Sequence, residues 1–362
     1  MLNLSQNGCS VWVTSSPELA LTPTAVALGK FDGVHRGHQR VIRPILPPFR
    51  KDDGEMGRLG DGEKLTPPPH HPTSLSQKPY NGSIFSTVVT FDPHPQEFFT
   101  GQPRSLLTPL DEKVYQLRSL GVQQLVLLPF DKELCALTPE EFVEKILVQQ
   151  LQAVQISVGQ DFRFGSRRTG NARDLQIIAA KYNIPVTIAS LETCAESPEI
   201  NTQMYQQTRI SSSLIREILA SGDIERANQL LGRPYTLIGT VIQGQQVGRT
   251  IGFPTANLEL PKDKFLPCHG VYAVRVFTVN ETLDIIGNAY FGVMNIGNRP
   301  TVNGIHLSVE VHLFDWSGDL YGKKLAVHLE KFLRPEQKFP NLEALKTQIQ
   351  LDCSAARAFF KC

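Results

Sequence analysis

Short apolar segments alternate with helical patterns through the first half of the chain. The apolar segments are apolar on both faces, as strands covered by helices on each side should be. They predict strands at Ala25–Leu28, Thr87–Thr90, Leu125–Leu128, Ile156–Val158 and Val186–Ala189. Regular alternation of strand and helix indicates a parallel, doubly wound α/β sheet of the Rossmann-like kind.

Two of the helical patterns carry clear end signals. The segment from Leu110 to Leu120 is followed by Gly121, which is suited to a helix C-cap. The segment from Pro139 to Gln152 is preceded by Thr138, with Glu141 three residues later. That spacing is typical of a capping box, so we expect the second helix to begin at Pro139.

After Leu231 the pattern changes to polar–apolar alternation with glycine-rich turns. The segments expected to form strands are Tyr235–Ile242, Gly270–Phe277, Ala289–Val293, Leu307–Phe314 and Leu325–Leu329. Strands of this kind predict an antiparallel sheet or a closed β-barrel. Apolar residues at helical spacing predict a C-terminal helix over Leu342–Phe360. We therefore expect two domains, 1–231 and 232–362, with the boundary near Gly232.

One segment differs in composition from the rest of the first domain. Residues 44–83 are rich in Pro, Gly, Ser and charged residues and nearly lack β-branched residues. Such a segment cannot bury enough apolar surface to offset the entropy of ordering it. We therefore expect a disordered insertion from Pro44 to Ser83.

Composition narrows the function classes. The chain has 362 residues, and 36 Lys and Arg against 35 Asp and Glu give a formal net charge of +1. This balance of charge argues against a nucleic-acid partner. The sequence contains no run of eighteen apolar residues, so we do not expect a membrane span. The N-terminus lacks the pattern of a secretory signal, and the six cysteines form no C-x-x-C pair. We expect a reduced, cytoplasmic protein.

Four unusual segments each follow a predicted strand of the first domain, at 29–38, 91–95, 130–131 and 159–165. Ligands of open parallel sheets bind at the carboxyl ends of the strands, where these four segments would converge. The sequence therefore predicts a ligand site at this edge of the sheet.

The first of these segments, G-K-F-D-G-V-H-R-G-H at 29–38, has the most specific chemistry. Gly33 and Gly37 allow the backbone to approach a ligand closely. His35 and His38 would share a face of a helical first turn, where they suit a polyphosphate that gains charge in a transition state. No G-x-x-x-x-G-K-[ST] motif is present, which excludes a Walker-type kinase. Surface histidines and a zinc pair are the alternatives, although no third zinc ligand is obvious.

Further residues of the first domain are compatible with an anion site. Ser211 to Ser213 can cap a helix, and Arg216 can hold an anion beside it; a simple capped helix is the alternative. The 159–170 segment carries charged residues that suit a nucleotide or flavin phosphate, or else form a surface salt-bridge loop. His94 lies between two prolines and is either a residue of the site or a turn residue.

The second domain has its own candidate site in G-R-T-I-G-F-P-T-A-N at 248–257. Gly244, Gly248 and Gly252 permit close backbone approach, while Thr255 and Asn257 offer the oxygen ligands that Mg²⁺ prefers. These two residues could also be ordinary turn residues. Glu310 lies on an alternating strand, where it is either solvated or available to accept a proton.

The first-domain motifs resemble those of the nucleotidyltransferase superfamily, specifically its FAD synthetase branch. The resemblance rests on H-x-G-H at 35–38, T-F-D-P-H-P at 90–95, the 159–170 segment and I-S-S-S-L-I-R at 210–216. It implies that His35 and His38 are catalytic. It implies ATP contacts by Gly29, Phe31, Asp32, Gly33, His35, His38, Ser211, Ser212 and Arg216, and FMN contacts by His94, Asp161, Arg163 and Arg168.

The second-domain motifs resemble those of riboflavin kinase, whose barrel has six strands. The resemblance rests on P-T-A-N at 254–257, the 295–301 and 309–315 segments, and L-R-P-E-Q-K-F at 333–339. It implies that Glu310 is the general base. It implies ATP contacts by Gly244, Gly248, Arg249, Gly252, Thr255 and Asn257, Mg²⁺ at Thr255 and Asn257, and riboflavin contacts by Tyr272, Asn295 and Glu310.

Together these motifs resemble the bacterial bifunctional riboflavin kinase/FMN adenylyltransferase family from about Ala25 to Phe360. The resemblance implies phosphorylation of riboflavin to FMN with Mg·ATP, then adenylylation of FMN to FAD with release of pyrophosphate. Two alternatives stay open: a transferase with another phosphate or acid acceptor, and a non-catalytic flavin- or nucleotide-sensing module. The expected partners are small molecules, and the sequence leaves the oligomeric state open.

Overall fold

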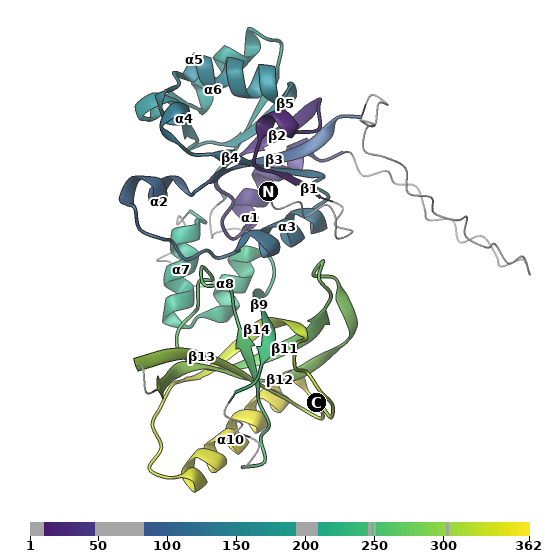
Figure 1. The fold of residues 1–362 in the computed structure, drawn as a ribbon, viewed down its shortest axis with the longest axis vertical. Helices are drawn as coiled ribbons and strands as arrows, with labels where there is room; N and C mark the ends of the chain where they lie inside the picture. The colour runs from purple at the N-terminus through teal and green to yellow at the C-terminus, as the bar shows by residue number, and fades with distance from the viewer. Residues whose placement is uncertain (1–10, 48–82, 193–208, 245–247, 249–250, 302–303) are drawn as a thin grey trace, which may run out of the picture.

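The structure has two bodies joined by a pair of helices (Figure 1). It is a computed structural model, and it describes residues 11–47, 83–192, 209–244, 248, 251–301 and 304–362. A sheet flanked by helices forms one end of the long axis and a β-barrel forms the other, with α7 and α8 between them (Figure 1).

The first body is built on a six-stranded sheet whose strands are all parallel. Its strands are β1 (Trp12–Thr14), β2 (Thr24–Leu28), β3 (Phe85–Asp92), β4 (Gln124–Pro129), β5 (Ala153–Gly159) and β8 (Val186–Ala189). The order β1-β4-β3-β2-β5-β8 puts β2 between β3 and β5, so the chain reverses its direction across the sheet there. All predicted strands are confirmed, whereas the short edge strand β1 was missed.

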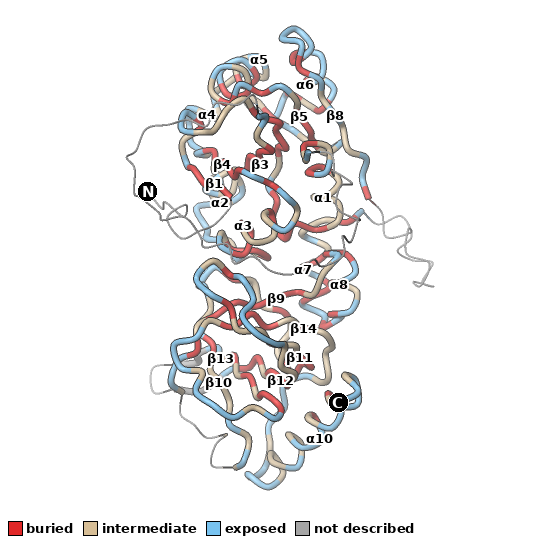
Figure 2. Tube along the Cα trace, turned by 90° about the vertical axis from the view of Figure 1, so that its right-hand side faces the viewer, coloured by how far each residue is buried: buried red, intermediate tan, exposed pale blue. Residues whose placement is uncertain are grey.

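Helices cover both faces of this sheet and leave its strands buried (Figure 2). A small hairpin, β6 (Arg163–Phe164) with β7 (Gly170–Asn171), follows β5. The capping box of Thr138 and Glu141 is confirmed, but the helix it begins is π-helical over Phe142–Gln150. The other helices are α1 (Arg36–Ile42), α2 (Pro95–Thr100), α3 (Leu110–Ser119), α4 (Lys132–Ala136), α5 (Pro139–Glu141) and α6 (Ala172–Ala180).

The second body is a closed antiparallel barrel with the strand order β10-β13-β12-β11-β14-β9. Its strands are β9 (Tyr235–Ile242), β10 (Ala256–Glu259), β11 (Gly270–Val279), β12 (Ile285–Thr301), β13 (Gly304–Leu313) and β14 (Lys324–Pro335). The predicted barrel is confirmed. Strand β10 was missed because its four residues follow directly on a turn-like segment. None of the described helices is long and apolar enough to cross a membrane.

Helices α7 (Ser212–Ser221) and α8 (Ile224–Leu231) belong to the hydrophobic core of the barrel. Ile215 and Leu230 on these helices lie in the same cluster of buried side chains as Tyr235 and Val327 on the barrel strands. The predicted domain boundary after Leu231 therefore falls between elements that share one core.

The predicted insertion begins later than we expected. Pro44 and Ile45 belong to a 3₁₀ helix, Arg43–Ile45, and the Ile45 side chain is buried in the core of the first body. Because the apolar side chain of Ile45 packs in this core, the segment without core contacts cannot start at Pro44. The remainder of the predicted insertion, from 48 to 82, lies outside the described residues.

The C-terminal helix α10 (Leu342–Phe360), predicted from its periodicity, is confirmed and is tied to the barrel by two ion pairs. Arg334 on β14 donates through its Nε and Nη2 atoms to Asp352, at 2.9 and 2.8 Å, and the Asp352 side chain is 7% exposed. Arg357 pairs with Asp315 at 2.9 Å, where the Asp315 side chain is 78% exposed. The buried pair should contribute far more to docking of the helix than the exposed one.

We predict that Asp352→Ala lowers the free energy of unfolding of the barrel by roughly 3 kcal/mol, because it leaves the guanidinium of Arg334 half-buried without its carboxylate. Asp315→Ala is the matched control and should change stability little. Urea unfolding, followed by the fluorescence of Trp316 in the barrel, measures both. Equal losses in the two variants would contradict the assignment.

Two candidate active sites

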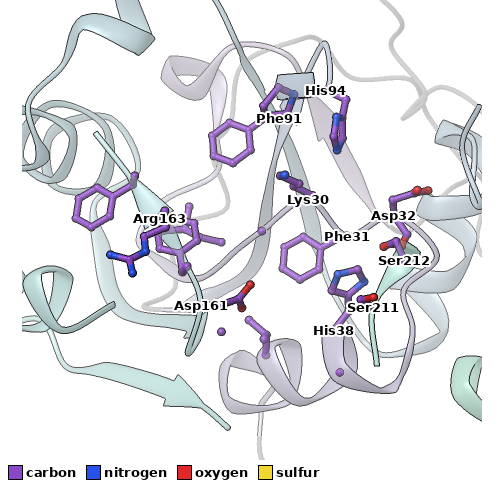
Figure 3. A pocket seen from close by; sticks show the side chains of 18 of the residues that line it. Lys30, Phe31, Asp32, His38, Phe91, His94, Asp161, Arg163, Ser211 and Ser212 are labelled. Atoms are coloured by element: carbon purple, nitrogen blue, oxygen red, sulfur yellow. The ribbon is translucent and has the colours of Figure 1, made fainter. Parts of the chain in front are cut away.

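A cavity of about 710 Å³ opens at the carboxyl edge of the parallel sheet. Leu28, Phe91, Phe130, Gly159 and Ala189, at or just after the ends of five strands, all line it. This is the position predicted from the sequence, and the volume suits a nucleotide-sized ligand. Figure 3 shows the side chains of Lys30, His38 and Asp161 arranged around this cavity.

Residues 29–38, here called the His loop, join β2 to α1 along one wall of the cavity. Three of them have left-handed backbone conformations: Phe31 at φ 45°, Gly33 at φ 89° and Val34 at φ 42°. A β-branched residue such as Val34 rarely adopts this region, so its conformation must be imposed by surrounding contacts. A Cβ atom on Gly33 would also collide with Leu107.

The two histidines of the His loop stack against each other. Their ring centroids lie 3.6 Å apart with an angle of 17° between the planes. His35 caps helix α1, and its Nδ1 atom accepts a hydrogen bond from the backbone N–H of His38 at 3.3 Å. Because Nδ1 is the acceptor, a neutral His35 carries its proton on Nε2 and can donate from there.

Burial makes both histidines poor cations. It lowers the pKa of His35 to about 4, and it holds the pKa of His38 well below the ordinary value, with a further contribution from His35. Near pH 7 both rings of the ligand-free protein are neutral. They can therefore serve as hydrogen-bond donors to a phosphate, and other residues must supply the positive charge.

Basic side chains supply this charge, including several that the sequence analysis passed over. Lys30 and Arg104 line the cavity together with Arg168 and Arg209. Burial lowers the pKa of Lys30, and the nearby Arg168 and Arg104 lower it further, as expected where cations are crowded. Asp161 forms an ion pair with Arg209 at 2.7 Å. Lys30 lies inside the quoted motif, whereas no local signal marked Arg104.

An aromatic wall completes the cavity. Phe91, Phe98, Phe99 and Phe130 form edge-to-face contacts, with ring centroids 5.3–5.8 Å apart. Phe99 is 71% exposed. Exposed aromatic rings beside a cavity offer a surface for a planar ring system to stack on. The sequence analysis placed Phe91 and Phe130 at this edge of the sheet but predicted no aromatic wall, because Phe98 and Phe99 join them only in the fold.

The structure brings most of the predicted first-domain residues to this cavity. Those that line it are Gly29, Phe31, Asp32, His35, His38, His94, Asp161, Arg163, Arg168, Ser211 and Ser212. Gly33 and Arg216 do not line it. The guanidinium of Arg216 instead pairs with the carboxylate of Asp32 and donates to the backbone carbonyl of Ser105 at 3.0 Å.

The second candidate site lies on the barrel and depends on strand register. Asn257 pairs with Glu310 across β10 and β13, and Glu310 pairs with Asn295 across β13 and β12. Residues paired in this way point to the same face of a sheet, which puts the three polar side chains in a row. The flanking residues Met294 and Val311 point the other way, into the barrel core.

Two hydroxyl groups hold the Glu310 carboxylate. Thr255 Oγ1 donates to Oε2 at 3.2 Å, and Ser308 Oγ donates to Oε1 at 2.9 Å. The segment that carries Thr255 is fixed to β13 because the carbonyl of Pro254 lies 2.8 Å from Nδ1 of His312. Sequence reasoning identified Thr255 and Glu310 but missed Ser308.

The glycines of this site are explained by close approaches. A Cβ atom at Gly244 would overlap the side chain of Asn257, and one at Gly248 would overlap the backbone of Phe253. Gly252 has φ 89°, which other residues rarely adopt. Arg249 lies outside the described residues.

Tyr272 does not join the row of polar residues. Its side chain is fully buried in the barrel core, where the ring packs against Phe332 and the hydroxyl donates to the carbonyl of Cys268. It pairs with Met294, whose side chain points into the barrel, rather than with Asn295. The structure therefore gives no support to the predicted contact between Tyr272 and riboflavin.

Comparison with known proteins fits both sites. A riboflavin kinase family model matches residues 231–360, and an FAD synthetase family model matches residues 18–54 and 73–204. A bifunctional riboflavin kinase/FMN adenylyltransferase of Haemophilus influenzae is 36% identical over 338 residues, covering 93% of this chain and 94% of the relative. One from Escherichia coli is 37% identical over 336 residues, covering 92% of each. This chain belongs to that bifunctional family.

The FAD synthetase match covers the sheet except its edge strand β1, together with the His loop and most of the cavity, and the riboflavin kinase match covers the whole barrel. A crystal structure described as a macrolide-efflux protein of Streptococcus pneumoniae shares the fold. It has a TM-score of 0.72 and 26% identity, covering 96% of this chain and 99% of that one. The arrangement of sheet and barrel is thus found in a solved protein.

We predict that His35 makes the ligand-free protein less stable as the pH falls. Its pKa is about 4 when folded, against an ordinary value of 6.5, so the unfolded chain binds the proton first. Stability should fall as the pH drops from 6.5 to about 4 and should be unaffected by His35 above pH 6.5. The full effect is on the order of 3 kcal/mol. His35→Gln should flatten the pH profile of the urea midpoint, and parallel profiles would refute this.

Proposed function

We propose that this chain makes FAD from riboflavin in two ATP-dependent steps, one at each candidate site. Riboflavin is phosphorylated to FMN, and FMN is then adenylylated to FAD with release of pyrophosphate. The observation that carries the proposal is that one chain holds a nucleotide-sized cavity lined by the His loop and, separately, a hydroxyl-held glutamate on a barrel. The His loop lies within the FAD synthetase match, and Glu310 lies within the riboflavin kinase match.

We assign adenylyl transfer to the cavity. A phosphate oxygen of FMN attacks the α-phosphorus of ATP, the bond to the β-phosphate oxygen breaks, and pyrophosphate leaves. The attacking phosphate is already anionic, so no general base is needed, and catalysis consists of positioning and charge stabilisation. The neutral imidazoles of His35 and His38 donate to the α-phosphate, while Lys30 and Arg104 balance the developing charge.

We assign the other contacts of this cavity by position. The Ser212 hydroxyl donates to the carbonyl of Asp32 at 2.8 Å. The backbone N–H of Ser212, rather than its side chain, is therefore available to a phosphate. His94, Asp161, Arg163 and Arg168 line the same cavity and are assigned to FMN. The flavin ring stacks on that wall. A contact between Arg216 and bound phosphate stays a prediction, since this side chain is paired with Asp32.

We assign phosphoryl transfer to the barrel. Glu310 accepts the proton of the 5′-hydroxyl of riboflavin as that oxygen attacks the γ-phosphorus of ATP. Ser308 and Thr255 hold one carboxylate oxygen each, which fixes the direction in which the base faces. Asn295 lies beside Glu310 in the register of β12 and β13 and is assigned to riboflavin.

The residues present on the barrel suit Mg²⁺. The hydroxyl of Thr255 and the amide of Asn257 lie beside the Glu310 carboxylate, and such hard oxygen donors are those that Mg²⁺ prefers in proteins. We propose that Thr255 and Asn257 hold it. Bound there, the ion would neutralise charge on the ATP phosphates, and the protein residues would do the orienting.

We also propose a cytoplasmic setting with small molecules as the only partners needed. The formal net charge of +1 offers no general attraction to nucleic acid or to an anionic membrane. The cysteines that the structure describes, Cys135, Cys268, Cys353 and Cys362, are free thiols.

Product analysis tests the proposal. The protein is incubated with riboflavin, ATP and MgCl₂, and the flavins are separated by chromatography over time. FMN should appear first and FAD should follow. Omitting MgCl₂ in the presence of EDTA should abolish both products. If riboflavin is phosphorylated but no FAD forms when FMN is supplied in excess, the cavity instead belongs to a transferase with another phosphate or acid acceptor.

His38→Ala should block FAD formation and spare FMN formation. The imidazole lies against the cavity and far in sequence from the residues of the barrel site, so only adenylyl transfer should lose a donor. Loss of one such donor typically costs about 10²–10³-fold in kcat. Initial rates on riboflavin and on FMN are measured on one preparation. Parallel loss of both rates, with an unchanged circular dichroism spectrum, would mean that the two sites are one.

Glu310→Gln should slow riboflavin phosphorylation and leave adenylylation of supplied FMN unchanged. Gln keeps the size of the side chain but cannot take the hydroxyl proton at neutral pH. General bases contribute about 10²–10⁴-fold, and the loose transition state of phosphoryl transfer favours the lower end. The same paired rates measure the effect. Near wild-type phosphorylation would show that Glu310 is only a solvated strand residue.

A further inference from the structure

The His loop of the sheet body is held in place in part by residues that lie about 180–200 positions further along the chain. Gly33 and Val34 adopt left-handed conformations at φ 89° and 42°, which the loop would not keep by itself. The backbone groups of Asp32, Gly33 and Val34 are bonded by Thr108 and Gln39 of the sheet body, by Ser212 on α7 and by Arg233 just before the barrel.

Three successive carbonyl groups of the loop accept hydrogen bonds, two of them from Ser212 and Arg233 and the third from Gln39 on α1. The carbonyl of Asp32 accepts from Ser212 Oγ at 2.8 Å. The carbonyl of Gly33 accepts from Arg233 Nη2 at 2.9 Å. The Nε2 atom of Gln39 contacts the carbonyls of both Val34 and Leu231, each at 3.0 Å, and so joins the loop to the end of α8.

Arg233 bonds directly to the backbone of the His loop. Its Nη2 atom reaches the Gly33 carbonyl, two residues before His35, and its Nε atom is inaccessible to solvent. It precedes β9 directly and lies inside the riboflavin kinase match at 231–360. A residue of the kinase part thus holds the backbone that aims the histidines of the adenylyltransferase part.

A second path runs through residues 105–108, here called the bracket. On one side, the N–H groups of Leu107 and Thr108 donate to the Asp32 carboxylate at 2.8 and 3.3 Å, and Gly33 N–H donates to Thr108 Oγ1 at 2.9 Å. On the other side, the bracket pairs with the barrel loop between β10 and β11, where Leu106 bonds the backbone of Asp263 and Phe265.

Lys264 fastens the bracket to the barrel. Its side chain is 1% exposed, and its ammonium group donates to the Leu107 carbonyl at 2.8 Å and to Glu112 Oε2 at 2.5 Å. It also lies over the ring of Tyr235, 4.5 Å from the centroid. A buried ammonium held by a carboxylate, a carbonyl and an aromatic face has one orientation, so the bracket has one position relative to the barrel.

We propose that Arg233 and Lys264, both in the riboflavin kinase part, are positioning residues for the transfer of AMP to FMN. They touch neither ATP nor FMN. They hold the His loop in its left-handed conformation, and through it the orientation of His35 and His38 over the α-phosphate. The barrel is therefore a structural component of the adenylyltransferase site, in addition to catalysing the first step. This inference rests on the function proposed above.

The test uses four variants of the full-length chain. Arg233→Met removes the donor to Gly33, and Arg233→Lys keeps one donor on a shorter side chain. The double variant Glu112→Gln with Lys264→Met removes the bracket's buried ion pair without leaving one charge unpaired. Arg357→Met is the control, because it removes a barrel arginine with a bidentate ion pair remote from the His loop. For each variant, kcat and KM are measured for riboflavin phosphorylation and for FMN adenylylation on one preparation.

We expect Arg233→Met to lower kcat for FMN adenylylation by about tenfold to hundredfold, the cost of a small displacement of reacting groups. KM for FMN and both constants for riboflavin phosphorylation should stay within about twofold, because the proposed FMN contacts and the barrel site are untouched. Arg233→Lys should recover part of the loss. The double variant should show the same selective fall, and Arg357→Met should show none.

Two results would overturn the inference: adenylylation by Arg233→Met and by the double variant within twofold of the wild type, or equal falls in both activities. Equal falls would mean that the side chains only stabilise the fold. If Arg233→Met does not yield folded protein, Arg233→Lys and the double variant decide the question alone. A wild-type protein that makes no FAD would instead refute the proposed function.

Discussion

The buried carboxylate of Asp32 is the interaction on which the sheet site depends. The residue is 2% exposed, and a carboxylate can lie there only if its charge is matched. It is matched by the guanidinium of Arg216 on α7 and by the N–H groups of Leu107 and Thr108. These partners come from two separate stretches of chain, so one side chain fixes the His loop against α7 and the bracket together.

The barrel site depends on a different constraint. Asn257, Glu310 and Asn295 lie in a row because they are paired across three antiparallel strands. Their alignment needs no strained backbone and no contact with the sheet body. This difference explains why we expect the kinase site to tolerate disturbances at the junction of the two bodies that the adenylyltransferase site does not.

Much of the fold could be predicted from the sequence because its signals are local. Continuous apolar runs gave the inner strands of the sheet, and polar–apolar alternation gave the barrel strands. The capping box at Thr138 was visible in four residues. Strands β1 and β10 were missed because each is too short to show a period, and β10 begins inside a glycine- and proline-containing segment.

The sites were only partly predictable, because what completes them is brought together over long sequence distances. The motifs marked His35, His38 and Glu310. No local pattern could show that the Arg216 guanidinium forms an ion pair with Asp32 or that Tyr272 is a core residue. Nor could a local pattern show that Phe91, Phe99 and Phe130 form one wall. The contacts of Arg233 and Lys264 likewise link residues roughly 150–200 positions apart, as burial of polar groups between two bodies requires.

A crystal structure of the wild-type protein with FMN and a non-hydrolysable ATP analogue tests the central claim most directly. We expect the nucleotide in the cavity at the carboxyl edge of the sheet, with its α-phosphate within hydrogen-bond distance of His35 and His38 and the flavin ring on the aromatic wall. The His loop should keep its left-handed residues and its bond to Arg233. Nucleotide bound on the barrel alone, or FMN away from that wall, would contradict the account.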